Sequence, residues 1–207
     1  MKAIDMRGRR AISGRIPYRR EEILRVAVEL FHRHGVSSAN VEAVASKAGI
    51  RPASLYHHFR DKQAIVDAVV DRAHARLVTR LNEREIAGAG AEGRLGALVD
   101  ELIDYVVEDI PLAAVGRHDR VHASQSTRRR GEQVENLLIE SVDSAIAEAR
   151  PGLSVGKRRA LAHALIGAIW SVTHFDARVE AAALREYLRR AGRAVVLGRR
   201  ARKRSAE

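Results

Sequence analysis

The sequence predicts an all-α protein, and three observations support that fold class. Apolar residues recur at spacings of three and four along most of the chain, which is the period of a helix. No window alternates apolar and polar residues as a half-buried strand would. The four prolines, Pro17, Pro52, Pro111 and Pro151, fall where helical patterns start or stop. A chain of 207 residues has room for one or two domains with a sizeable core.

Two helices are expected before residue 50. The first ends at Gly35, because glycine suits the left-handed position that closes a helix. Its apolar face consists of Ile23, Leu24, Ala27, Leu30 and Phe31. The second begins after Asn40, a favourable N-cap, and ends at Gly49. Glu42 in its first turn suits the positive end of the helix dipole.

A third, short helix is expected from Pro52 to Phe59. A fourth follows Asp61, which is well placed as its N-cap, and continues to about residue 84. The stretch AGAGAEG at 87–93 is the clearest loop. Beyond it the periodicity predicts a less regular piece near 112–122 and further helices at about 95–109, 127–149, 156–174 and 180–197.

Composition excludes several classes of protein. The chain has no cysteine, which rules out disulfides and thiolate catalysis and suits a reducing compartment. It has no run of about 18 apolar residues, so no transmembrane helix is expected. The basic N-terminal stretch lacks the apolar segment of a secretory signal. We therefore expect a cytoplasmic protein that has no contact with a membrane.

The formal net charge of +11 is concentrated at the two ends of the chain. Residues 1–62 carry 13 Lys and Arg against 6 Asp and Glu, and residues 189–207 carry 8 against 1. The segment between them has a net charge of −3. A basic beginning and end around a nearly neutral middle favour a polyanionic partner.

The stretch AVASKAGIRPASLYHHFRDK, residues 43–62, holds two short helical patterns joined by a turn with Gly49, as in a helix-turn-helix. Glycine suits this turn because it adopts a left-handed conformation without steric penalty. Leu55 and Phe59, four residues apart, would anchor the second helix to the core. The side chains left on its outer side are Ser54, Tyr56, His57 and His58. Hydroxyl and imidazole groups in such a place hold phosphates or meet base edges.

The sequence GVSSANVEAVASKAGIRPASLYHHFRDKQAIVDAVV resembles the DNA-binding domain of TetR-type transcriptional repressors. The resemblance covers about residues 19–75 and depends most on the spacing Leu-Tyr-x-x-Phe-x-x-Lys at 55, 56, 59 and 62. It implies a three-helix, helix-turn-helix DNA-binding domain followed by a helical domain for ligand binding and dimerisation. The expected division is a basic arm at 1–18, the DNA-binding domain at 19–64, the helical domain at 65–198 and a basic tail at 199–207.

The resemblance assigns DNA contacts to the residues at matching positions. These are Asn40, Ser54, Tyr56 and Lys62 for the phosphate backbone, and His57 and His58 for a phosphate or a base edge. Arg51, Pro52 and Ala53 open the recognition helix, whose N-terminal residues meet the major groove. Arg51 is the leading candidate for a bidentate contact with guanine.

Two positions depart from the family pattern. Arg51 stands where a small capping residue is usual, so the recognition helix is expected to start with a weaker cap. Glu42 stands where many relatives carry a basic or polar residue. An exposed acid there would repel phosphate or accept a hydrogen bond from cytosine N4. The basic arm either enters the minor groove or takes no part, and both alternatives stay open.

A homodimer is supported by the sequence as well as by the resemblance. In KRRALAHALIGAIWSVTHF, residues 157–175, the small side chains along one helical face are Ala160, Ala164, Gly167, Ala168 and Ser171. The last helix adds Leu184, Tyr187, Leu188 and Ala191. Two such helices from each of two subunits would form a four-helix bundle. The alternative is that these faces complete the core of a monomer.

The resemblance also implies a small-molecule effector. The candidate pocket walls, each of which also fits a plain core position, are Leu98, Leu102, Tyr105, Val106, Leu137, Leu138, Val142, Trp170 and Phe175. His118 and His122 are four residues apart but have no firm third ligand, so neither a metal site nor a cofactor is expected. No phosphate loop, G-x-S-x-G or H-E-x-x-H motif is present, and no residue is assigned to catalysis.

We therefore expect a ligand-responsive DNA-binding regulator, a repressor that binds a palindromic operator in double-stranded DNA and is released by a small, mostly apolar molecule. Two alternatives stay open. An all-α enzyme would use the histidines and the carboxylates in the middle of the chain. A nonspecific nucleic-acid-binding or adaptor protein would depend on the basic ends and would show no preference among DNA sequences.

Overall fold

The computed structural model describes residues 8–82, 90–174 and 179–197, and within these ranges it contains helices and no strand. The all-α prediction is confirmed. In chain order the elements are α1 (Gly8–His34), α2 (Val41–Lys47), α3 (Pro52–Tyr56), α4 (Lys62–Asn82), α5 (Gly90–Glu108), α6 (Ile110–His118), η1 (Asp119–His122), α7 (Gln125–Ala149), α8 (Val155–Trp170), η2 (Ser171–Thr173) and α9 (Ala181–Leu197). None of the described helices is long and apolar enough to cross a membrane.

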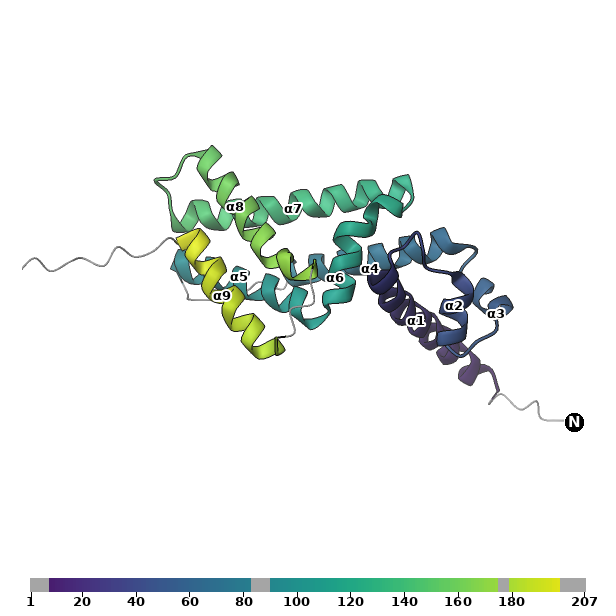
Figure 1. Ribbon diagram of the computed structural model, residues 1–207. Coiled ribbons are helices and arrows are strands. Elements are labelled where there is room, and N and C mark those ends of the chain that lie inside the picture. The colour runs from purple at the N-terminus through teal and green to yellow at the C-terminus, as the bar shows by residue number, and fades with distance from the viewer. Residues whose placement is uncertain (1–7, 83–89, 175–178, 198–207) are drawn as a thin grey trace, which may run out of the picture.

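The molecule has two parts, each built around its own apolar core. We call the first part the head; it consists of α1, α2, α3 and the N-terminal half of α4. The second part is the body, which consists of α5 to α9 and the C-terminal end of α4. Figure 1 shows the head at one end of the molecule, with α8 and α9 near the other end and α4 between the two parts.

The turns of the head form as the sequence predicts. Gly35 ends α1 at φ +74° and Gly49 ends the α2 region at φ +66°, so both glycines are left-handed. Asn40 is the N-cap of α2, and its side chain accepts a hydrogen bond of 2.9 Å from a backbone N–H of the first turn. Asp61 does the same at the start of α4, at 2.8 Å. That bond lowers the pKa of the Asp61 carboxyl, because it favours the charged form.

α1 begins at Gly8 and continues through Pro17. Pro17 therefore does not mark a helix start, contrary to the expectation from the sequence. The second half of the segment expected as a basic arm is helical and continuous with the first helix of the head. Residues 1–7 and the expected basic tail lie outside the described residues.

The segment expected as a less regular piece near 112–122 is instead mostly a helix, α6, followed by η1. Asp109 caps α6 by accepting a hydrogen bond of 3.1 Å from the backbone N–H of Leu112. Pro111 occupies the first turn, where its missing N–H leaves no bond unmade. In the expected loop at 87–93, residues 90–93 are helical because α5 begins at Gly90, and residues 87–89 lie outside the described residues.

Two helices contribute to both cores. α4 places Ile65, Val66, Val69, Val70 and Ala73 in the head core, and Leu77 and Leu81 in the body core. α6 places Leu112 and Val115 in the head core and Ala113 in the body core. The core of the head therefore continues beyond residue 64, the expected end of the domain.

The two shared helices cross at very short range. A Cβ atom built on Gly116 of α6 would lie 2.4 Å from the Cβ of Ala73 in α4. Neither atom can rotate away, since both are fixed to their backbones. A glycine at position 116 therefore sets the distance between α4 and α6.

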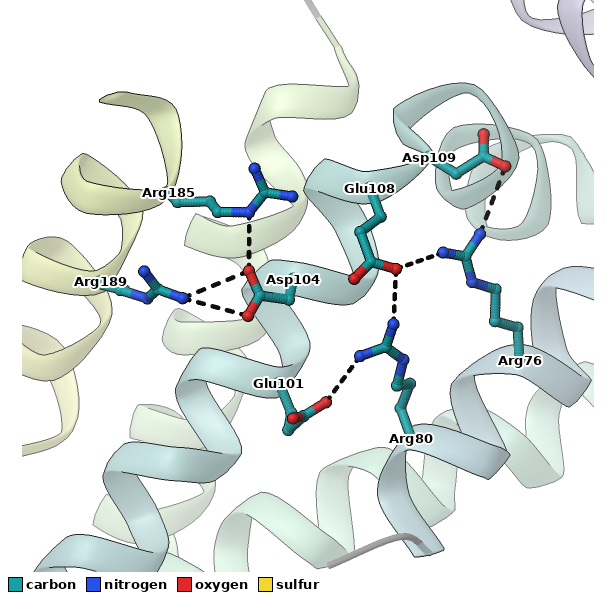
Figure 2. Close-up of polar contacts among 8 residues, drawn as sticks. All are labelled: Arg76, Arg80, Glu101, Asp104, Glu108, Asp109, Arg185 and Arg189. Carbon is teal, nitrogen blue, oxygen red and sulfur yellow. Dashed lines mark hydrogen bonds and ion pairs between the residues drawn. The ribbon is translucent and has the colours of Figure 1, made fainter. Parts of the chain in front are cut away.

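Carboxylates along α5 join it to helices on both sides, as Figure 2 shows. Towards α4, Glu108 pairs with Arg76 and Arg80, at 2.6 Å each, and Arg80 also pairs with Glu101. Towards α9, the Asp104 carboxylate accepts hydrogen bonds from Arg185 at 2.8 Å and from Arg189 at 3.2 Å. Linked pairs of this kind hold several long side chains in one arrangement, although each exposed pair alone contributes about 0–1 kcal/mol.

Replacing Gly116 by Ala should destabilise the protein by about 1–3 kcal/mol, because the added methyl group forces α4 and α6 apart. Thermal unfolding followed by circular dichroism measures the change. The matched control is Gly156→Ala in the first turn of α8, where an added Cβ meets no atom within 4 Å. That variant should be unchanged or slightly more stable, since alanine favours a helix. Equal stability of the two variants would contradict the close crossing.

Candidate nucleic-acid interface and effector cavity

The α2–α3 unit has the geometry of a helix-turn-helix. α2 and α3 are separated by a turn in which Gly49 is left-handed and the N–H of Ile50 donates to the carbonyl of Ala45 at 3.0 Å. Leu55 is completely buried and Phe59 nearly so, which confirms that they anchor α3 to the head core. The guanidinium of Arg20 lies 4.9 Å from the centre of the Phe59 ring and covers it from the α1 side.

The opposite side of α3 faces solvent. Arg51, Pro52 and Ala53 at its start are exposed, as are Tyr56, at 48%, and His57. Ser54 and His58 are half-buried. Five of the seven residues expected to meet DNA from this helix are therefore accessible at one surface. An aromatic residue with nearly half of its surface exposed, on a helix whose other face is buried, is a sign of a binding surface.

Two further predicted contacts flank this helix. Asn40 is exposed. Its side-chain oxygen accepts the hydrogen bond that caps α2, and this bond fixes the orientation of its side-chain amide. Lys62, in the first turn of α4, donates a hydrogen bond of 3.1 Å to the backbone carbonyl of Ser37. That bond places the ammonium group between the α1–α2 loop and the start of α4, where backbone N–H groups also point outward.

The departures noted in the sequence have structural counterparts. Arg51 is the N-cap residue of α3 and makes no side-chain cap hydrogen bond. The recognition helix therefore starts without the stabilisation of a side-chain cap, and the guanidinium is held by no such bond. Glu42 is exposed in the first turn of α2.

The comparison with known families supports this geometry. A family model described as "Bacterial regulatory proteins, tetR family" matches residues 23–69, which cover most of α1, all of α2 and α3, and the start of α4.

Residues 23–69 therefore match the TetR family, and they include the helix-turn-helix of the head.

A sequence relative within this group is the transcriptional regulator UidR of Escherichia coli (strain K12). It is 33% identical over 91 residues, which are 44% of this chain and 40% of UidR. The match therefore spans less than half of the length of that relative. The family consists of regulatory proteins, in agreement with the expectation that the chain is a regulator and not an enzyme.

Solved structures extend the likeness to the whole fold. A TetR-family regulator from Bordetella parapertussis 12822 has a TM-score of 0.76 at 18% identity, over 87% of this chain and 95% of that chain. AibR, whose structure holds isovaleryl coenzyme A and operator DNA, has a TM-score of 0.69 at 17% identity, over 83% of this chain and 96% of that chain. At these identities the likeness shows that the body, too, has the TetR fold.

The body of this TetR-type chain contains a small cavity of 30 Å³ where α4, α5, α6 and α7 meet the C-terminal end of α8. Of the predicted pocket walls, Tyr105, Leu138 and Trp170 line it. Leu98, Leu102, Val106 and Val142 are instead buried in the body core, and Leu137 is exposed at 37%. Phe175 lies outside the described residues.

Four polar residues that the sequence analysis missed also line the cavity: His74, Arg117, Arg120 and Glu135. Arg117 was missed because α6 was not expected to be a helix, and His74 and Glu135 because only the tertiary packing brings α4 and α7 to the same cavity. Tyr105 connects the cavity to the head, since its hydroxyl donates to the carbonyl of Ala73 at 3.0 Å. Burial raises the pKa of Tyr105 far above its usual value, so the hydroxyl keeps its proton.

The predicted dimer residues fall into two groups. Ala160, Ala164, Gly167, Ser171 and Ala191 are exposed, Ala168 is half-buried, and Tyr187 is 62% exposed. Leu184 and Leu188 face inward and belong to the body core. The outer faces of α8 and α9 are therefore free of large contacts within the subunit, as a dimer surface requires. The dimer itself stays a prediction.

At the end of α6, His118 contacts the residues that follow α8. His118 Nε2 lies 2.7 Å from Thr173 Oγ1, and its ring is 4.2 Å from the ring of His174. His122 is on η1. Across the part of the chain that the structure describes, no three His, Asp or Glu side chains are grouped to hold a metal ion.

Lys62→Ala should weaken binding to all DNA sequences by a similar factor, because an ammonium group at this place meets phosphate and carries no sequence information. Its salt dependence should also become shallower by about one phosphate contact. Fluorescence anisotropy over a range of salt concentrations measures both. Arg94→Ala, which removes an exposed charge in the body, is the control and should change neither.

Arg51→Ala should act differently, by relaxing the preference for one base pair in each half-site at about 1–3 kcal/mol per lost contact. The measurement compares single-base variants of a preferred duplex with the wild-type and Arg51→Ala proteins. A uniform loss of affinity on preferred and scrambled duplexes alike would show that Arg51 contacts only the DNA backbone.

Proposed function

We propose that the protein is a homodimeric, ligand-responsive repressor that binds a palindromic operator through α3 and is released by a small, mostly apolar molecule. The observation that carries this proposal is the two-sided nature of α3. Its inner side chains, Leu55 and Phe59, are buried, while Arg51, Tyr56 and His57 are accessible on one outer surface. A helix of five residues needs no such outer residues for stability, and a major groove accepts a helix with this polarity.

Dimerisation is supported by the outer faces of α8 and α9. Small side chains at 160, 164 and 167 let two copies of α8 approach closely, and Tyr187 offers a large exposed apolar surface beside them. A two-fold axis through these faces would relate the two heads. Such a dimer binds two half-sites separated by about one turn of DNA or a multiple of it.

Release by a ligand is supported by the position of the cavity. Gly116 and Leu77, which line it, lie on the two helices that enter both cores. A molecule that widens the cavity therefore changes the packing of α6 against α4. AibR, whose structure holds isovaleryl coenzyme A and operator DNA, is a protein of the same fold that binds partners of both kinds.

The body also holds the head through polar contacts beyond the cavity. Gln63 donates to the carbonyl of His122 at 2.8 Å, and Asp67 accepts from the backbone N–H of Ser124 at 2.8 Å. Arg130 of α7 forms a bidentate ion pair with Asp71. Because η1 and the start of α7 are attached to α4 in this way, a shift of α6 displaces the helix that carries Lys62.

The proposal is tested by selection of random DNA duplexes with the purified protein at physiological salt, followed by titration of the winner against a scrambled duplex. A two-fold symmetric winner bound about a thousandfold better than the scrambled duplex is the expected result. Equal affinity for all duplexes would favour the alternative, a nonspecific nucleic-acid-binding or adaptor protein with the same fold. Salt must be held constant, because phosphate contacts alone change with it.

Ala164→Glu should convert the dimer to a monomer, because it places a charge in the middle of the small-residue face of α8. Sedimentation velocity gives the mass, and the affinity for the selected duplex should fall by about 10²–10⁴-fold as the second head is lost. Ala75→Glu, on an exposed position of α4, is the control and should remain dimeric. A wild-type protein that sediments as a monomer would contradict this part of the proposal.

A further inference from the structure

The cavity in the body contains a guanidinium that is poorly neutralised. Arg117, on α6, is half-buried. Its guanidinium carbon, Cζ, lies over the indole of Trp170, 5.4 Å from the ring centre. Its ion pair with Glu135 of α7 is long, at 3.8 Å. Burial lowers the pKa of Arg117, the direction expected when a cation leaves water without full compensation.

The carboxylate that could neutralise Arg117 is already used. Glu135 makes a much shorter ion pair, of 2.5 Å, with Arg120. Among the residues that line the cavity, two guanidinium groups therefore share one carboxylate. The lining has an excess of one positive charge, and a single negative charge near Arg117 would balance it.

A second polar group in the cavity wall lacks a partner. His74 of α4 is half-buried, and burial is the main cause that lowers the pKa of its imidazole. Its Nδ1 atom is buried and makes no hydrogen bond, although the ring interacts with the Gly116 backbone. A hydroxyl group of a bound molecule could donate to this nitrogen.

The remainder of the wall is apolar and aromatic. It consists of Leu77, Ala113, Val134, Leu138, Trp170 and the ring of Tyr105. The free volume of 30 Å³ holds about two water molecules, so any larger molecule must displace side chains. The contact between Arg117 and Glu135 is long, at 3.8 Å, so an acidic group of a bound molecule can replace Glu135 beside Arg117.

We infer that the effector is an apolar molecule that carries an acidic group, which pairs with Arg117 while the apolar portion lies against Trp170, Leu138 and Leu77. This inference rests on the proposed function, since it names the chemical class of the effector of that function. The acidic group belongs either to a free carboxylic acid or to the phosphates of a coenzyme A thioester, and binding experiments separate these two sources.

Isothermal titration calorimetry of the wild-type protein, without DNA, compares decanoate, decan-1-ol and decanoyl coenzyme A. The acidic probe that binds should do so at least tenfold more tightly than the neutral alcohol, as expected for a charge-assisted hydrogen bond. Tighter binding of decanoate identifies a carboxylic acid as the source, and tighter binding of decanoyl coenzyme A identifies a thioester. Equal affinity for the alcohol and the acids, or no binding of any probe, overturns the inference.

Variants assign the effect to the cavity. Arg117→Gln should weaken binding of the acidic probe at least tenfold and leave the affinity for decan-1-ol within about twofold. Glu135→Gln should change acid binding in the opposite direction, because it removes the carboxylate that competes for the guanidinium groups. Arg94→Gln removes a guanidinium from an exposed pair with Glu148, far from the cavity lining, and should bind all probes as the wild type does.

An acid preference that persists in Arg117→Gln, or acid binding that is weakened by Glu135→Gln, overturns the assignment. The two variants are expected to change the affinity for the acid in opposite directions, and poor folding of one variant cannot produce both changes. Calorimetry does not involve DNA, whereas the duplex titration of the wild-type protein does not involve a ligand. Failure of this inference and failure of the proposed function are therefore separate results.

Discussion

The crossing of α4 and α6 is the constraint on which the rest of the structure depends. Ala73 and Gly116 bring the two helices so close that a methyl group does not fit between them. At this point the head core ends, the body core begins, and the cavity opens. Helices in a protein core pack at the density of organic crystals, so a small displacement of one helix at such a crossing moves the other helix as well. The proposed DNA-binding surface and the proposed effector cavity are therefore joined through the contact between Ala73 and Gly116 and the helices that carry them.

The head could be predicted almost entirely from the sequence, because its structure depends on local signals. Asn40 and Asp61 cap helices, Gly35 and Gly49 supply left-handed turns, and Leu55 is fixed by its spacing. Each of these effects acts over a few residues, and the motif places them in a fixed order. The start of α1 was the exception, since a helix through Pro17 has no local signal of its own.

The site in the body could be predicted only in part. Tyr105, Leu138 and Trp170 were identified because aromatic and apolar residues are common in pocket walls, but the same pattern describes a core, and Leu98 and Val106 proved to be core. The polar lining was missed because it depends on tertiary packing. His74 and Arg117 are far apart in sequence and meet only where α4 and α6 cross. No periodicity in the chain reveals that the guanidinium groups of Arg117 and Arg120 share the carboxylate of Glu135.

The arginines of the body and those of the head differ in their surroundings. Arg76 and Arg80 of α4 and Arg185 and Arg189 of α9 pair with carboxylates of α5 (Figure 2). Arg51, at the start of α3, is exposed. Over residues 19–62 the head carries 8 Lys and Arg against 5 Asp and Glu, so its net charge is positive. Salt weakens exposed pairs and phosphate contacts alike, so the affinity for DNA and the coupling between head and body both depend on ionic strength.

The claim that head and body form one mechanical unit is tested most directly by unfolding in denaturant with a separate probe in each part. Trp170, the single tryptophan, reports on the body, and a fluorophore on Ser46→Cys reports on the head, since the chain has no other cysteine and Ser46 is exposed on α2. Two coincident transitions at the same protein concentration are expected if the cores share α4 and α6. A head that unfolds at lower denaturant while the Trp170 signal stays native would contradict the claim.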